Sequence, residues 1–387
     1  MNNKLYYVCK YTPLELLAAF GAQCENLNHM PEGFDTADQI AHPNICGFGK
    51  SVLEAVLAGD VRELVLVNCC DTIRSVYDLL QEAQPSETSR VDDTAEAALR
   101  FEQGQDGLPE EVVQMDFLYM LDMLHCGNDC SRERVAAQLK DLAKKYGEYK
   151  GRTFDPETFR AAFAMPQTAS TEKAGATARL QPHIAVLGAR MGEELFEMAV
   201  QQMPLPLVNE TCVYNRSVTW TYEGDLQDFD SLMDWYAGEL LGQIPCMRMV
   251  DNTGRRQLYQ DPSLKGIIYH TVKFCDFYSF EYAQIKAHTD VPLLKIESDY
   301  TVQSSGQLLT RFEAFAESLS LNPQTAEAIR EFHESAQNTG VGCGFNDGEQ
   351  GVKANRRFSR GGRITGVIPG SVGDNSETGG LCGGCER

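Results

Sequence analysis

The chain has 387 residues, 43% of them hydrophobic, and a formal net charge of -21. Such a length and composition predict a globular protein large enough for two ordinary domains. The negative charge argues against binding to nucleic acid or to an anionic membrane surface, because both need clustered Lys and Arg. No apolar run is long enough to span a membrane, and the N-terminus lacks the features of a signal peptide, so we expect a cytoplasmic protein.

In the first half, short β-branched runs alternate with stretches of helical period, a pattern typical of parallel α/β folding. The predicted strands cover 4–8, 63–67 and 115–121, and the predicted helices cover 12–22, 50–59, 72–83 and 131–147. We expect the last of these helices to end at Gly147. Residues 84–110 are polar and acidic, which predicts a surface insertion or a mobile loop.

The alternation restarts after a linker-like stretch at 166–178. The predicted strands of the second half cover 183–189, 205–211, 265–272 and 291–300, and the predicted helices cover 191–203, 231–244, 279–289, 307–319 and 325–337. We therefore expect two similar α/β domains, 1–160 and 178–338. Residues 339–387 are rich in glycine and poor in large apolar residues, so we expect a flexible tail there.

Cysteines follow predicted strands in both halves. Cys70 comes after the strand at 63–67 and Cys275 after the strand at 265–272, and each is followed at once by an aspartate. Ligands of open α/β sheets bind outside the carboxyl ends of the strands. The two matching Cys–Asp pairs thus predict two domains that face each other across one central cleft.

Further cysteines occupy loops on what should be the same side of each sheet: Cys46, Cys126, Cys212 and Cys246. Thiolates from separate loops suit an iron–sulfur cluster or zinc. Structural zinc sites usually pair two CxxC turns, but the one CxxC here, Cys382 to Cys385, lies in the tail, so a cluster ranks above zinc. The alternative is that the cysteines are small core residues, as we expect for Cys9 and Cys24.

Three stretches carry a resemblance to a known family. They are CGFGKSVLEAVLAGDVRELVLVNCCD, GQIPCMR and KGIIYHTVKFCDFYSFEYAQIKAHTDVPLLKIESDYTVQSSGQLLTRFEAFAE. The chain resembles the 2-hydroxyacyl-CoA dehydratase and benzoyl-CoA reductase family over nearly all of residues 1–335, and not over the tail.

The resemblance implies a fold of two Rossmann-like parallel-sheet domains around an oxygen-sensitive iron–sulfur cluster. It also implies an ATP-hydrolysing iron–sulfur activator protein that injects a low-potential electron. Dehydratases of this family use that electron to form a ketyl radical on a 2-hydroxyacyl-CoA, which allows water to leave. The chain lacks the spacing of a phosphate-binding loop, so the nucleotide belongs to the partner.

Carried over by position, the three-cysteine ligand set of a [4Fe–4S] cluster falls on Cys46, Cys70 and Cys275, with Cys69 as a packing neighbour. One branch of the family holds a double cubane, [8Fe–9S], with about six ligands. In that case Cys126, Cys212 and Cys246 complete the set, with Cys130 competing for the place of Cys126. The double-cubane branch resembles an ATP-dependent reductase of small molecules.

Several alternatives stay open from the sequence. The chain is either a catalytic dehydratase or reductase component or a non-catalytic cluster-bearing subunit, and it forms either a homodimer or a heterodimer with a related chain. The substrate is a small molecule or an acyl-CoA. Lys50 either balances the charge of a cluster or is an ordinary surface lysine, and His270 is either a hydrogen-bonding residue of the strand end or a ligand.

Overall fold

The computed structural model describes residues 4–84, 115–164, 181–302 and 305–339. All of them belong to one compact unit. Apart from their first residues, the predicted acidic insertion at 84–110 and the predicted tail at 339–387 lie outside the described residues.

The first sheet has four parallel strands in the order β2-β1-β3-β4. They are β1 (Lys4–Tyr7), β2 (Gln23–Asn26), β3 (Glu63–Val67) and β4 (Phe117–Leu121). β3 is buried along its whole length because its aliphatic side chains meet helices on both faces of the sheet. β2 was not predicted, since this edge strand has polar residues and is only half-buried.

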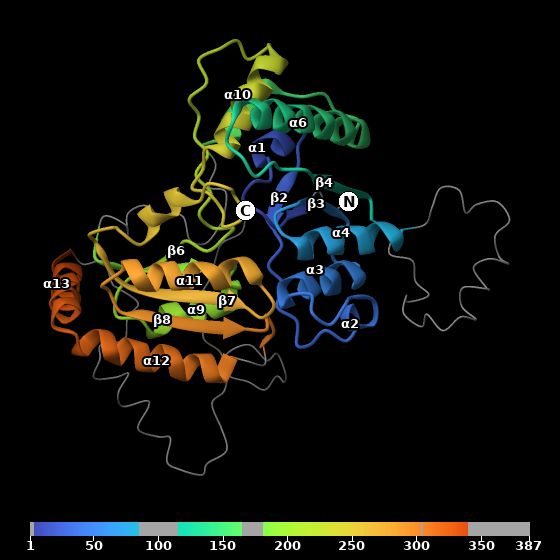
Figure 1. Cartoon of the computed structure of the whole chain (residues 1–387). Coiled ribbons are helices and arrows are strands. Elements are labelled where there is room, and N and C mark those ends of the chain that lie inside the picture. The colour runs from blue at the N-terminus through green and yellow to red at the C-terminus, as the bar shows by residue number, and fades with distance from the viewer. Residues whose placement is uncertain (1–3, 85–114, 165–180, 303–304, 340–387) are drawn as a thin grey trace, which may run out of the picture. The chain divides into compact units, whose positions relative to one another are not determined.

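Helices cover both faces of this sheet. They are α1 (Leu14–Ala18), α2 (Ala37–Ile40), α3 (Gly47–Leu57), α4 (Asp71–Glu82), α6 (Asp129–Lys150) and α7 (Pro156–Ala162). Figure 1 shows α1 and α6 on one side of the strands and α3 and α4 on the other. The expected end of α6 at Gly147 was wrong: the helix continues to Lys150, and Gly151 ends it with a φ of 62°.

The second sheet repeats this arrangement, with four parallel strands in the order β6-β5-β7-β8. They are β5 (His183–Gly188), β6 (Leu207–Asn209), β7 (Leu264–Val272) and β8 (Leu293–Ser298). The helical elements are α9 (Glu193–Gln202), α10 (Phe229–Leu241), the 3₁₀ helix η2 (Thr253–Leu258), α11 (Asp276–His288), α12 (Ser305–Leu321) and α13 (Pro323–Thr339).

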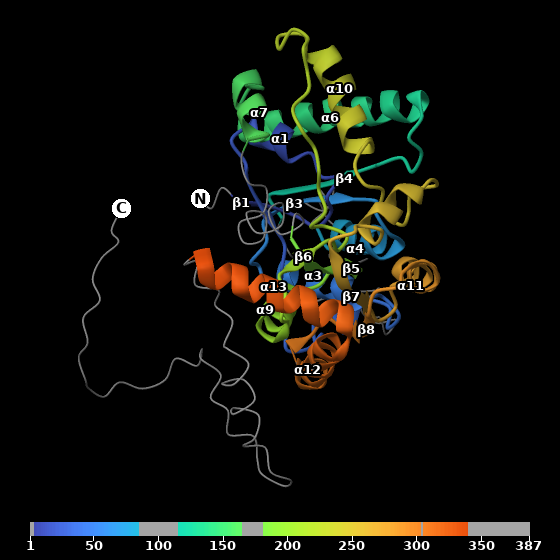
Figure 2. The same cartoon turned by 90° about the vertical axis from the view of Figure 1, so that its left-hand side faces the viewer.

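Alternate residues of β5 and β7 pack into different cores. Ile184 and Ile268 join α9 and α12 on one face, whereas Ala185 and Tyr269 join α11 on the other. The predicted α/β class with two Rossmann-like parallel sheets is therefore confirmed. The predicted boundary between domains 1–160 and 178–338 stays a prediction. Helix α10 belongs by sequence to the second of these domains, but it lies beside α6 of the first (Figure 2) and contributes to the first core.

Within the described ranges, no helix combines the length and the apolar character that a membrane crossing requires.

Candidate functional site

The two sheets share one topological feature. When the strands are numbered within their own half, both orders read 2-1-3-4, so the order reverses between β1 and β3 and again between β5 and β7. In open α/β sheets the crevice at such a reversal is the preferred ligand site. Cys9 follows β1, and Cys69 and Cys70 follow β3; in the second half Arg190 follows β5 and Cys275 follows β7.

Residues from both reversal points line a single cavity of about 80 Å³. Seven of them are cysteines, which we call the cavity cysteines: Cys9, Cys46, Cys69, Cys70, Cys212, Cys246 and Cys275. The structure thus brings together five of the six cysteines predicted as ligands. The sixth, Cys126, is exposed and does not line the cavity, and neither does its neighbour Cys130.

Three cavity cysteines stand directly before a helix. Cys46 precedes α3, Cys70 precedes α4 and Cys275 precedes α11, each with an extended backbone. Burial raises the pKa of Cys46 to about 11 and also raises the pKa of Cys275, while the backbone amides of Gly49 and Tyr278 act in the opposite direction. Ionised thiolates at these positions therefore need further positive charge, which metal ions provide.

Cys9, Cys69 and Cys70 form a hydrogen-bonded group. A hydrogen bond from Cys69 lowers the pKa of Cys70 and of Cys9, and the same contacts raise the pKa of Cys69. A thiol has one proton, so Cys69 donates to one neighbour at a time. The sequence analysis placed Cys9 in the core and Cys69 in packing, although Cys9 follows β1 much as Cys70 follows β3, which is the signal that could have identified it.

Cys212 and Cys246 reach the cavity from the loops after β6 and α10. Burial raises the pKa of Cys212 to about 12 and also raises the pKa of Cys246. The Cys246 sulfur accepts a hydrogen bond from the backbone N–H of Arg248 at 3.3 Å, and the backbone N–H of Cys246 donates to the Tyr11 hydroxyl at 3.2 Å. The contact with Tyr11 ties this loop to the segment after β1.

The charged lining of the cavity is positive. Lys10, Arg190 and Arg248 are part of it, whereas no Asp or Glu occurs among its described lining residues. Lys10 is buried and donates to Asn215 Oδ1 at 2.9 Å and to the carbonyl of Ile244. Burial lowers the pKa of Lys10 to about 8, and the nearby Cys246 opposes that shift.

An unusual backbone conformation constrains one cysteine loop, and a close backbone contact constrains another. Phe274, directly before Cys275, has a φ of 69°, in the left-handed region that non-glycine residues seldom adopt. Gly47, directly after Cys46, packs on the turn that follows β8: a Cβ atom there would lie 1.8 Å from the carbonyl oxygen of Asp299. Only glycine fits at that position without a shift of the backbone.

Two polar residues considered from the sequence lie outside the cavity lining. Lys50 is mostly buried and pairs with Asp38 at 2.6 Å. His270 is fully buried, with Nδ1 3.1 Å from the Ala189 carbonyl and Nε2 2.9 Å from the Ser298 hydroxyl. The contacts of both side chains are those of structural residues.

The donor atoms of the cavity limit the kinds of metal that it could hold. Its seven cysteines come from separate loops, and thiolates are ligands of iron–sulfur clusters and of zinc. Among the described residues, no group of three or more His, Cys, Asp and Glu is arranged to hold a metal ion.

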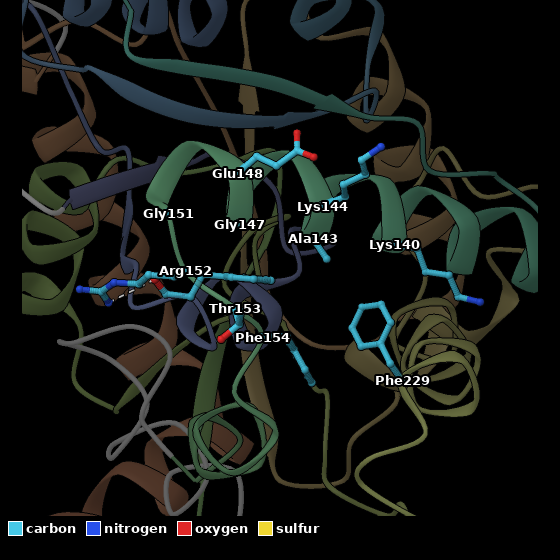
Figure 3. A pocket seen from close by; sticks show the side chains of 11 residues that line it. Lys140, Ala143, Lys144, Gly147, Glu148, Gly151, Arg152, Thr153, Phe154 and Phe229 are labelled. Carbon is cyan, nitrogen blue, oxygen red and sulfur yellow. Dashed lines mark hydrogen bonds between the residues drawn. The ribbon is translucent and has the colours of Figure 1, made fainter.

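A second, wider pocket of about 580 Å³ lies along α6. Figure 3 shows Glu148 and Lys144 extending from one side of this helix and Phe229 on the other. Arg152, also in its lining, donates to the carbonyl of Phe20 at 3.3 Å. Its described lining holds no cysteine and no histidine, so the cysteine cavity is the stronger candidate for redox chemistry.

The protein is an α/β protein of the Rossmann-like class, with two parallel sheets and one cysteine-lined cavity at their reversal points. The chain matches the family model described as 2-hydroxyglutaryl-CoA dehydratase, D-component, over residues 9–170 and 165–319. It belongs to this family, which confirms the resemblance drawn from the sequence. No significant match was found among curated proteins.

Proposed function

We propose that this chain is the cluster-bearing component of an oxygen-sensitive enzyme of the 2-hydroxyacyl-CoA dehydratase family. The observation that carries the proposal is the cavity at both reversal points, with its seven cysteines. Its electrons come from an ATP-hydrolysing iron–sulfur activator protein. A homodimer and a heterodimer with a related chain both remain predictions.

The chemistry of the lining supports an iron–sulfur cluster. Cys46, Cys70 and Cys275 would hold a [4Fe–4S] cluster, since each stands at a helix N-terminus where partial positive charge favours the thiolate. The three cations of the lining offset the negative charge of a thiolate-ligated cluster. When bound, such a cluster supplies single electrons of low potential to the thioester carbonyl of an acyl-CoA.

The remaining groups of the chain hold and shield this site. The buried Lys10 keeps the loop of Ile244 against the segment after β1, and Phe48, Phe277 and Val272 limit the access of water to the sulfur atoms. The dehydration itself is redox-neutral. The C2–O bond and a β C–H bond break, the hydroxyl group and a proton leave as water, and the electron that entered is returned.

A double-cubane reductase is the second candidate, and the number of cavity cysteines favours it. Cys9, Cys212 and Cys246 would join the first three ligands, with Cys9 in the place that the sequence analysis gave to Cys126. A non-catalytic subunit with the same cluster is the third alternative.

The test is the iron and acid-labile sulfide content of the full chain after anaerobic purification. About four irons per chain support the single cubane and about eight the double cubane. Cys70→Ala is expected to lose most of the iron, whereas Cys130→Ala, the matched change at an exposed cysteine, is expected to keep it. A wild-type chain that stays free of iron after anaerobic reconstitution would refute the proposal, and iron loss in Cys126→Ala would restore that residue to the ligand set.

A further inference from the structure

Arg190 follows β5 by two residues, and the protein holds it rigidly. It is 2% exposed. Its Nε donates to the Tyr300 hydroxyl at 3.0 Å, and its Nη2 donates to the carbonyl of Leu27. The guanidinium carbon lies 4.7 Å from the centre of the Phe48 ring, so the plane of the group is also fixed.

The third nitrogen of Arg190 is different. Nη1 is buried and makes no hydrogen bond within the described protein, although Arg190 lines the cysteine cavity. A buried donor on a charged group is costly when it is left without an acceptor. A hydrogen-bond acceptor bound in the cavity would satisfy this donor.

Other buried arginines show what is missing at this position. Arg216 pairs with Glu15 at 2.8 Å, and Arg255 pairs with Glu281. In the described part of the chain Arg190 has no carboxylate partner, and the cavity that it faces has three cations and no carboxylate. The charged lining of this cavity is positive although the chain has a net charge of -21, which calls for a negatively charged occupant.

We infer that Arg190 donates a hydrogen bond from Nη1 to a sulfur atom of the group held by the cavity cysteines and makes that group easier to reduce. The inference rests on the proposed function, since it needs a cluster in the cavity. One-electron reduction adds one negative charge to the cluster, and a nearby fixed cation stabilises the reduced form more than the oxidised form. A charge-assisted hydrogen bond to sulfur acts in the same direction.

The test is a redox titration of the anaerobically purified full chain, with the reduced cluster followed by electron paramagnetic resonance. Arg190→Gln removes the charge and keeps a polar side chain. At the midpoint potential of the wild type we expect its ratio of reduced to oxidised cluster to fall about tenfold or more, a shift of about 59 mV for one electron. Arg190→Lys keeps the charge and is expected to stay closer to the wild type.

Lys50→Gln is the matched control, because Lys50 is a buried cation that already pairs with Asp38 and does not line the cavity. Its midpoint should equal that of the wild type. If Arg190→Gln fails to fold or to bind iron, Arg248→Gln decides. Arg248 lines the cavity but pairs with Asp71, so its loss should lower the reduced fraction in the same direction by a smaller factor.

The outcomes separate the two proposals. A wild-type chain without iron refutes the proposed function itself. A wild-type chain with a cluster, combined with an unchanged midpoint in Arg190→Gln that retains full iron, overturns the role of Arg190 alone. An unchanged midpoint in Arg248→Gln overturns it in the same way where that variant decides. An anionic substrate as the true partner of Nη1 would show as that same unchanged midpoint.

Discussion

At the scale of single residues, His270 shows how burial changes the pKa of a side chain that contacts the cavity lining through Ala189. It lies in β7, fully buried, with both ring nitrogens in hydrogen-bonding contact and none of the ring in the cavity lining. Desolvation lowers its pKa from 6.5 to about 4. The ring is therefore neutral in the folded protein at pH values where it is already protonated in the unfolded chain.

This shift predicts a pH dependence of stability. Between pH 6.5 and pH 4 the unfolded state binds a proton that the folded state does not, so the free energy of unfolding falls as the pH falls. The full shift corresponds to roughly 3 kcal/mol, present above pH 6.5 and lost by pH 4. Urea unfolding of wild type and His270→Gln at pH 7, 6 and 5 measures it, and the variant should show the weaker pH dependence. Parallel curves for the two proteins would contradict the assignment.

The sequence identified some site residues and missed others for a physical reason. Cys70 and Cys275 were found because each follows a predicted strand of a parallel sheet, and the carboxyl ends of such strands carry ligands. Lys10 and Arg190 were not found. A lysine or arginine after a strand is common on a protein surface, and no neighbouring residue marks Lys10 or Arg190 as part of the cleft that the two Cys–Asp pairs predict.

At the scale of elements, the central strands were predictable and the edges were not. β3 and β5 are apolar after their first residues, Glu63 and His183, so the sequence predicted their burial on both faces of the sheet. β2 is short and half-exposed, and it forms a strand because it pairs with β1, since its own residues do not favour one. In α6 a glycine suggested an end, but Gly147 lies inside the helix. A Cβ atom there would lie 2.9 Å from the Phe20 ring, so this glycine allows close packing and does not end the helix.

One buried ion pair links the elements around Cys246 and Cys275. Arg255 in η2 donates to Glu281 in α11, and its Nη1 donates to the carbonyl of Pro245 at 3.0 Å. Both side chains of the pair are almost completely buried. The pair therefore holds the loop of one cavity cysteine against the helix of another.

Loss of Arg255 is expected to be costly, because Glu281 would stay buried without its partner. We expect Arg255→Met to lower the free energy of unfolding by about 3–5 kcal/mol. Arg256→Met changes the next residue of the same 3₁₀ helix, which is exposed, and should cost far less. Chemical unfolding of the two variants gives the comparison. Equal losses would show that the buried pair contributes no more than an exposed arginine, and the double variant with Glu281→Met should recover part of the stability.

At the scale of the whole molecule, the cavity is built by loops of both sheets together. Its cysteines come from loops of both sheets, and its three cations have no carboxylate among the described lining residues. Arg248 pairs with Asp71, which lies outside the lining, whereas Lys10 and Arg190 have no carboxylate partner in the described part of the chain. A group that binds both sets of loops in the folded chain, and only weakly in the unfolded chain, stabilises the entire fold by mass action.

Removal of iron should therefore destabilise both halves together. We expect anaerobic treatment with an iron chelator to lower the midpoint of thermal unfolding by roughly 5 °C or more, in one transition that includes both sheets. Cys70→Ala, which is expected to bind little iron, should start near the lower midpoint and should not respond to the chelator. Scanning calorimetry on the four samples makes the comparison. If iron-replete and iron-depleted wild type unfold at the same temperature, the metal is not held where both sheets contribute ligands.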